Sequence, residues 1–174
     1  MTHELYYDEL QTPIGTLLVL VYEGKVIRID FGTFHDQQDQ LIQWTSRYLK
    51  DAIFTRDKIK TSFVMKELDE YFYQGRKQFT VSIKLFGTQF QQRVWQTLYE
   101  TTPYGTTKTY QELAIAINHP KAVRAIGGAL NKNPIAIVVP CHRIIGKNNH
   151  LVGFGGGIEK KQWLLAHEGV NICS

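Results

Sequence analysis

The stretch Pro134-Ile135-Ala136-Ile137-Val138-Val139-Pro140-Cys141-His142-Arg143 joins an apolar run directly to a thiol, an imidazole and a guanidinium. Residues 135–139 are apolar and mostly β-branched, which is typical of a short buried strand, although a buried helical segment has a similar pattern. Pro140 ends the run because proline has no N–H to donate to a neighbouring strand. We therefore expect Cys141, at the end of a rigid strand, to be either a nucleophile or a buried structural thiol.

The length and composition are those of a globular protein with a sizeable core. The chain has 174 residues, of which 43% are hydrophobic, enough for one domain or two small ones. It contains no apolar run near the roughly 20 residues that span a bilayer, and it begins without the basic-then-apolar pattern of a signal peptide. These features lead us to expect a cytoplasmic protein.

The chain has two cysteines, Cys141 and Cys173. Two are too few for a disulfide framework or for a zinc site built from four thiolates. The six histidines show no metal-ligand spacing. Cys173 lies one residue from the end of the sequence and is expected to be exposed and inert.

The formal net charge of +4 is distributed unevenly. Residues 1–84 carry a net charge of −1, whereas residues 85–174 carry +5 and contain no aspartate. A basic half points to a polyanionic partner, nucleic acid above all, although a solvated basic surface gives the same composition.

The first half predicts a small α+β domain without a recognisable catalytic constellation. Strands are indicated by apolar, β-rich runs between turn residues, and helices by apolar residues at helical spacing, with Ser62 as a possible cap. The expected strands are 5–10, 16–22, 26–31 and 79–85, and the expected helices are 38–49 and 62–73.

The second half predicts a helix-turn-helix. The capping boxes Thr88-x-x-Gln91 and Thr109-x-x-Glu112 each begin a helical pattern. A short turn then leads to a third helix over 121–131, and two short helices joined in this way form the motif.

The third helix carries unusually small side chains. Gly127 and Gly128 lie in its interior, where each costs about 1 kcal/mol relative to alanine. A bare helix allows close approach of a ligand or of another helix, and Arg124 is the long side chain in its middle. The pattern favours nucleic-acid contact and tight helix packing about equally.

Beyond Cys141, the glycine-rich segment 153–157 is expected to form a mobile wall over a pocket, since it lacks the Lys-Ser/Thr of a phosphate loop. The last helix is expected over 159–168. Glu168 at its C-terminus opposes the helix dipole, so the carboxylate either has a buried partner or is a tolerated surface charge.

Pro140-Cys141-His142-Arg143 closely resembles the active-site motif of O6-alkylguanine-DNA alkyltransferases, the methylated-DNA–protein-cysteine methyltransferases. Further motifs of the family stand in its order through most of the second half. They are Pro103-Tyr104-Gly105, Thr109-Tyr110-Gln111-Glu112-Leu113-Ala114, Lys121-Ala122-Val123-Arg124-Ala125-Ile126-Gly127-Gly128-Ala129, Asn133-Pro134 and Trp163-Leu164-Leu165-Ala166-His167-Glu168-Gly169. The first half resembles the family's N-terminal domain only in its order of strands and helices.

The resemblance implies an α+β chain of two domains. Residues 1–84 would form a ribonuclease-H-like domain, and residues 85–174 a mostly helical, winged-helix-like domain that binds DNA and accepts the alkyl group. The implied reaction is irreversible transfer from O6-alkylguanine, and from O4-alkylthymine, to Cys141 after base flipping. The implied protein is a monomer that needs no cofactor and acts once. The zinc ligands of some relatives' N-terminal domains have no counterpart here, so we predict no metal.

The resemblance also implies a role for each matched residue. Cys141 resembles the alkyl acceptor, His142 the base that activates it through a water, and Glu168 the acid that orients the histidine. The residues implied to contact the substrate or DNA are Tyr110, Arg124, Asn133, Arg143, Phe154, Lys161, Gly127 and Gly128. Among them Tyr110 would contact the flipped guanine, Arg124 would fill the vacated stack, and Asn133 would link the recognition helix to the active-site strand.

The chain departs from the family pattern at two positions. Phe154 stands where relatives often have tyrosine, so a hydroxyl contact is missing, and Ala136 replaces a proline found in some relatives. Both substitutions put the range of alkyl groups in question.

The chemistry can also be argued from the residues. A thiolate is a soft, strong nucleophile, but a thiol with a pKa near about 8.5 needs a base at neutral pH. Extrusion of a damaged base costs a few kcal/mol, and an arginine beside small residues can occupy the space it leaves.

Two other functions remain open. The first is a DNA-damage sensor that does no chemistry, against which the presence of Cys141 argues. The second is a cysteine hydrolase using Cys141, His142 and Glu168, which would turn over repeatedly on an activated ester.

Overall fold

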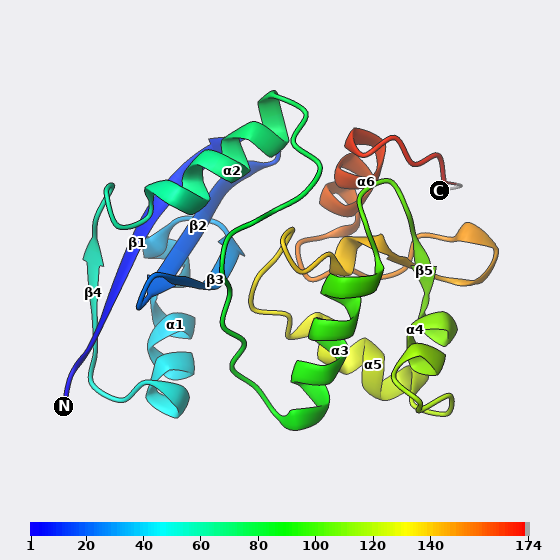
Figure 1. Cartoon of the computed structure of the whole chain (residues 1–174), viewed down its shortest axis with the longest axis horizontal. Helices are drawn as coiled ribbons and strands as arrows, with labels where there is room; N and C mark the ends of the chain where they lie inside the picture. Colours follow the sequence, from blue (N-terminus) through cyan, green and yellow to red (C-terminus); the bar gives the residue numbers. More distant parts are fainter. Residues whose placement is uncertain (173–174) are drawn as a thin grey trace. The chain divides into compact units, whose positions relative to one another are not determined.

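A four-stranded sheet forms the centre of the first of two units in this computed structural model, which describes residues 1–172 (Figure 1). Its strands lie in the order β3-β2-β1-β4, and all neighbours are antiparallel except the parallel pair β1 and β4. The strands are β1 (His3–Thr12), β2 (Gly15–Tyr22), β3 (Lys25–Phe31) and β4 (Ala52–Arg56). Contacts divide the chain at Phe86 and Gly87.

Helices α1 (Phe34–Tyr48) and α2 (Ser62–Tyr73) cover the sheet. Residues 17–21 of β2 are all buried. Since alternate side chains of a strand point to opposite faces, β2 is covered on both faces, with Leu41 of α1 packed against Leu18 and Leu20. The uninterrupted apolar run of this strand therefore follows from its central position.

Several expected boundaries in this unit are wrong. Helix α1 begins at Phe34 rather than residue 38, because Thr33 and Asp36 form a capping box upstream of the apolar pattern. Thr61, not Ser62, is the N-cap of α2, and it makes no side-chain capping bond. Strand β4 was not anticipated, since three of its five residues are exposed and it lacks apolar alternation.

The strand expected over 79–85 is also wrong. The segment makes one isolated bridge, between Val26 and Ile83. Before this bridge, Thr80 is anchored by the buried carboxylate of Glu67. That carboxylate accepts hydrogen bonds from the backbone N–H of Thr80, at 2.7 Å, and from the Thr80 hydroxyl. Side-chain anchoring therefore replaces a continuous strand ladder here.

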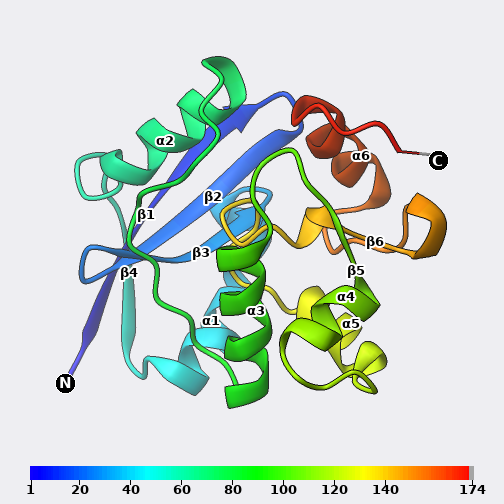
Figure 2. The ribbon, with the colours of Figure 1, turned by 45° about the vertical axis from the view of Figure 1, so that its right-hand side comes forward.

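The second unit is mostly helical, as Figure 2 shows. Its elements are α3 (Gln89–Thr101), β5 (Lys108–Thr109), α4 (Tyr110–Ala116), α5 (Val123–Asn131), a 3₁₀ turn (Cys141–Arg143), β6 (Ile144–Ile145), a second 3₁₀ turn (Lys147–Asn149) and α6 (Ile158–His167). Strands β5 and β6 pair in parallel. Both predicted capping boxes form, with Thr88 and Thr109 as the caps of α3 and α4.

The apolar run 135–139 is buried, but it is not a strand. Its backbone bonds within itself: the N–H of Val138 donates to the carbonyl of Ala136 at 2.8 Å, and the N–H of Val139 to that of Ile135 at 3.0 Å. Ile137 has a φ of 73°, which a β-branched residue rarely adopts. Cys141 therefore follows a buried turn and begins a 3₁₀ turn, so its predicted place at the end of a strand is wrong.

The other differences in this unit are small. Helix α5 begins at Val123 rather than residue 121, and α6 spans Ile158–His167 with Glu168 as its C-cap. Within residues 1–172, no helix is both long and apolar enough to cross a membrane.

Candidate functional site

Asn133 holds the Cys141 segment in place from the end of α5. Its side-chain N–H group donates to the carbonyl of Val139 at 2.8 Å and to Sγ of Cys141 at 3.1 Å. Its side-chain oxygen accepts from the N–H of Ile135 at 3.0 Å. One side chain thus fixes both ends of the buried turn and the position of the thiol.

Cys141 lines a small pocket and is 9% exposed. The other residues that line the pocket are Tyr110, Leu130, Asn131, Gly153, Phe154 and Gly155. The space for a water-sized molecule is about 10 Å³, which is about one water. The pocket brings together three predicted site residues, Cys141, Tyr110 and Phe154.

The surroundings of the buried Cys141 thiol favour its protonated form. Burial raises the pKa of Cys141, and the hydrogen bond from Asn133 and the charge of Lys161 lower it by less. A thiol of this kind needs a proton acceptor before it can act as a nucleophile.

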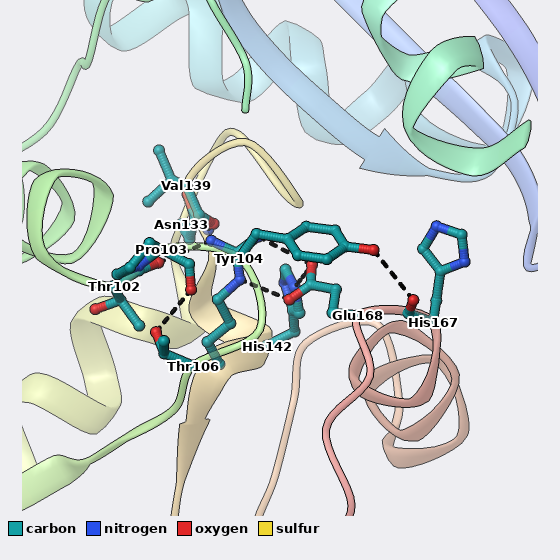
Figure 3. A network of polar contacts seen from close by, with 10 residues as sticks. Thr102, Pro103, Tyr104, Thr106, Asn133, Val139, His142, His167 and Glu168 are labelled. Carbon is teal, nitrogen blue, oxygen red and sulfur yellow. Dashed lines mark hydrogen bonds and ion pairs between the residues drawn. The ribbon is translucent and has the colours of Figure 1, made fainter. Parts of the chain in front are cut away.

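His142, which follows Cys141 in the chain, forms a buried pair with Glu168 (Figure 3). The distance between Nε2 of His142 and Oε2 of Glu168 is 2.8 Å. Because an ionised carboxylate only accepts hydrogen bonds, Nε2 carries the ring proton. Burial lowers the pKa of His142, and the charges of Arg143 and Lys161 lower it further. Together these effects outweigh the opposing effect of Glu168, which favours a neutral ring. Its Nδ1 is buried and has no hydrogen-bond partner among the described residues, which leaves a free lone pair.

Arg143 lies inside the protein rather than on a DNA-facing surface. It is 6% exposed, and its Nε and Nη2 donate to the two oxygens of Glu168 at 2.7 and 2.9 Å. Its Nη1 donates to the carbonyl of Thr102 at 2.8 Å. Although burial alone would raise the pKa of Glu168, its bonds to His142 and Arg143 hold that pKa well below its ordinary value. The expected buried partner of Glu168 is therefore present.

Lys161 projects from α6 into the interior and is 1% exposed. Its ammonium group donates to the carbonyl oxygens of Ile144 and, at 3.1 Å, Val152. Burial lowers the pKa of Lys161 to about 8, and Cys141 opposes this shift when it is a thiolate. Lys161 thus ties β6 to the segment that precedes the glycine-rich wall.

The remaining predicted residues lie on α4 and α5. Tyr110 is half-buried, and a Cβ built on Gly127 would lie 4.0 Å from its ring. Gly128 and Arg124 are exposed, and a Cβ on Gly128 would meet nothing within 4 Å. Packing within the protein therefore does not require a glycine at position 128.

Thr102 and Tyr104 are not among the predicted site residues. The Thr102 carbonyl anchors Arg143, and the Tyr104 hydroxyl donates to the carbonyl of His167 at 3.1 Å. The Pro103-Tyr104-Gly105 motif is the sequence feature that could have drawn attention to these residues. A motif alone does not predict which distant residues they contact. The described residues contain no group of three or more His, Cys, Asp or Glu that could hold a metal ion.

Two family models match the chain, one to each unit. Residues 5–85 match the ribonuclease-like domain of 6-O-methylguanine DNA methyltransferase, and residues 89–170 match its DNA-binding domain. A methylated-DNA–protein-cysteine methyltransferase of Haemophilus influenzae is 41% identical over 94% of this chain and 86% of its own length. The chain belongs to this methyltransferase family.

Solved structures of the family share the fold. The O6-methylguanine methyltransferase of Mycobacterium tuberculosis matches with a TM-score of 0.79 and 37% identity, over 94% of this chain and 92% of that one. The same protein in complex with DNA matches with a TM-score of 0.78 and 38% identity, over 95% and 92%. The predicted family and the predicted α+β fold, with a helical second part, are confirmed.

Proposed function

We propose that this chain repairs DNA by moving the alkyl group of O6-alkylguanine, and of O4-alkylthymine, irreversibly to Sγ of Cys141. DNA repair by alkyl transfer is the activity of the family to which the chain belongs. The observation that carries the assignment to Cys141 is that its thiol lines a pocket, while the next residue in the chain is a buried histidine whose Nδ1 has no hydrogen-bond partner among the described residues. The damaged base would be flipped out of the duplex to reach it.

The proposed reaction balances without a cofactor. The Cys141 proton passes through a water to Nδ1 of His142, and the thiolate attacks the alkyl carbon. The C–S bond forms as the C–O6 bond breaks, the bonding pair leaves with O6, and the proton returns to the guanine. The product thioether is stable, so each molecule reacts once.

The pocket must widen to admit a base. It holds about one water in this conformation, and Gly153, Phe154 and Gly155 form one of its walls. The glycine-rich segment is the part of the wall with the greatest backbone freedom. We infer that this segment moves outward when the base enters, and that Phe154 then lies against it.

Helix α5 is the proposed DNA-contacting element. Its exposed face carries Arg124 and the unobstructed Gly128, and the surrounding half of the sequence has a net charge of +5. A small residue permits close approach to the minor groove, where an arginine can fill the space left by a flipped base. The DNA complex of the M. tuberculosis relative supports DNA as the partner.

Replacing Arg124 with alanine should slow repair of duplex DNA by about tenfold or more, because the vacated stack would stay unfilled at a cost of a few kcal/mol. Reaction with the free base should change little, since no stack has to be opened. Single-turnover rates on both substrates check this. Equal slowing on both would remove the stacking role.

The experiment that tests the function is the intact mass of the protein after mixing with duplex DNA holding one O6-methylguanine. We expect a stoichiometric gain of one methyl group, mapped to the Cys141 peptide. Tight binding to the damaged duplex without a mass gain would support a sensor. Repeated release of product from an activated ester would support a hydrolase.

We propose that the protein works as a monomer in the cytoplasm. One chain supplies the pocket, the base and the DNA-contacting helix, so the reaction requires no second copy. The cytoplasmic location rests on the scarcity of cysteines and on the nature of the substrate.

A further inference from the structure

We infer that Arg143 is a positioning residue for the reaction: it holds Glu168 as a carboxylate in one orientation and thereby keeps Nδ1 of His142 free to accept a proton. This role differs from the DNA contact assigned to Arg143 by resemblance. The test by methyl-transfer rate rests on the proposed function, whereas the test by the tautomer of His142 does not.

The geometry fixes the carboxylate from two sides. The guanidinium of Arg143 reaches both oxygens of Glu168, at 2.7 and 2.9 Å. A bidentate pair of this kind sets the plane of the carboxylate as well as its place. One of these oxygens also accepts a hydrogen bond from Nε2–H of His142, at 2.8 Å. This bond selects the tautomer in which Nδ1 is unprotonated.

Arg143 is itself held at the ends of two helices. Thr102, whose carbonyl it binds at 2.8 Å, is the C-cap of α3, and Glu168 is the C-cap of α6. Helix C-termini carry partial negative charge, which a cation stabilises. The guanidinium therefore offsets two helix ends and the carboxylate, and this explains how an acid is tolerated at the end of α6.

The charges around the histidine predict what Arg143 does to its protonation. The ionisable groups that act on the pair are Arg143, Lys161 and Tyr104. The positive charge of Arg143 and the negative charge of Glu168 balance each other. A proton on His142 would therefore add an uncompensated positive charge to a buried site. Without Arg143, the carboxylate would draw a proton onto His142, and an imidazolium cannot accept the proton of the thiol.

The test is the pH dependence of the single-turnover methyl-transfer rate for Arg143→Met and Arg143→Lys. In Arg143→Met the acidic limb should move upward by at least about one pH unit, so the rate falls more at the acidic end of the profile than at pH 8.5. Arg143→Lys keeps the positive charge. Its acidic limb should therefore lie at the same pH as in the unaltered protein, although the maximal rate should be lower. Arg28→Met removes the bidentate Arg28–Asp30 pair in the first unit and should leave the profile unchanged. A uniform loss of rate at all pH values would overturn the inference.

A measurement on the unaltered protein covers the case in which Arg143→Met does not fold. ¹⁵N NMR of the imidazoles should show one histidine, the fully buried His142, as the Nε2–H tautomer without titration between pH 5.5 and 8. An Nδ1–H tautomer, or titration near the ordinary value of about 6.5, would overturn the inference. If no methyl transfer occurs but the tautomer is as expected, the proposed function fails, while the orientation of His142 by Glu168 stands.

Discussion

Replacing Cys141 with alanine is expected to abolish the methyl gain while leaving the protein folded and able to bind damaged duplex DNA. Alanine has no nucleophilic atom, and the site offers no second thiol among the pocket-lining residues. The fold should tolerate the change because Asn133 still donates to the carbonyl of Val139 and accepts from the N–H of Ile135. Only the weak bond to sulfur is lost.

Intact mass and gel-shift titration on the same preparation check both halves of this prediction. Cys173, predicted to be exposed and inert, lies outside the described residues, and Cys173→Ala serves as the matched thiol control that keeps full methyl gain. A methyl group on the Cys141→Ala protein would show that another atom is the acceptor. Loss of duplex binding in that variant would show that the thiol also supports the DNA-binding surface.

The parts of the fold that could be predicted are those with local signals. At Thr88 and Thr109 the cap and its partner lie three residues apart, and both hydrogen bonds of each box form as expected. The starts of α3 and α4 follow from these contacts alone. The hairpin of β2 and β3 is local in the same way.

The buried turn over 135–139 could not be predicted, because its cause is not local. Five apolar residues indicate burial, which is correct, but burial does not distinguish a strand from a turn. The turn depends on Asn133, which satisfies backbone groups at both of its ends, and on packing that holds Ile137 at a φ of 73°. The local conformational preference of β-branched residues favours a strand, not a turn.

Arg143 illustrates a limit of motif reading at the site. The motif places an arginine two residues after the cysteine, where a DNA contact is a reasonable assignment. Its partner Glu168 is 25 residues away, and nothing in the spacing of the two residues predicts that they meet. The anomaly of an acid at a helix C-terminus predicted a buried partner for Glu168, but not which residue it is.

Replacing Glu168 with glutamine should lower the free energy of unfolding by about 3–5 kcal/mol. Glutamine keeps the shape of the side chain but removes its charge, so the buried guanidinium of Arg143 loses its counter-ion. Urea denaturation should show a lower midpoint with an unchanged m-value. Arg56→Gln breaks an ion pair whose arginine is 58% exposed and should change stability by about 1 kcal/mol or less.

The pH dependence of stability separates the charge of Glu168 from its packing. The folded-state pKa of Glu168 is lowered, so its contribution is present above the unfolded value of about 4.3 and declines as the pH falls below that value. In Glu168→Gln, this part of the decrease in the free energy of unfolding at acidic pH should be absent. The double variant Arg143→Met/Glu168→Gln should lose less stability than the two single changes added together, because no buried charge is left without a partner. Additive losses would mean that the two side chains stabilise the protein through separate contacts, and the pair would then not be the unit that orients His142.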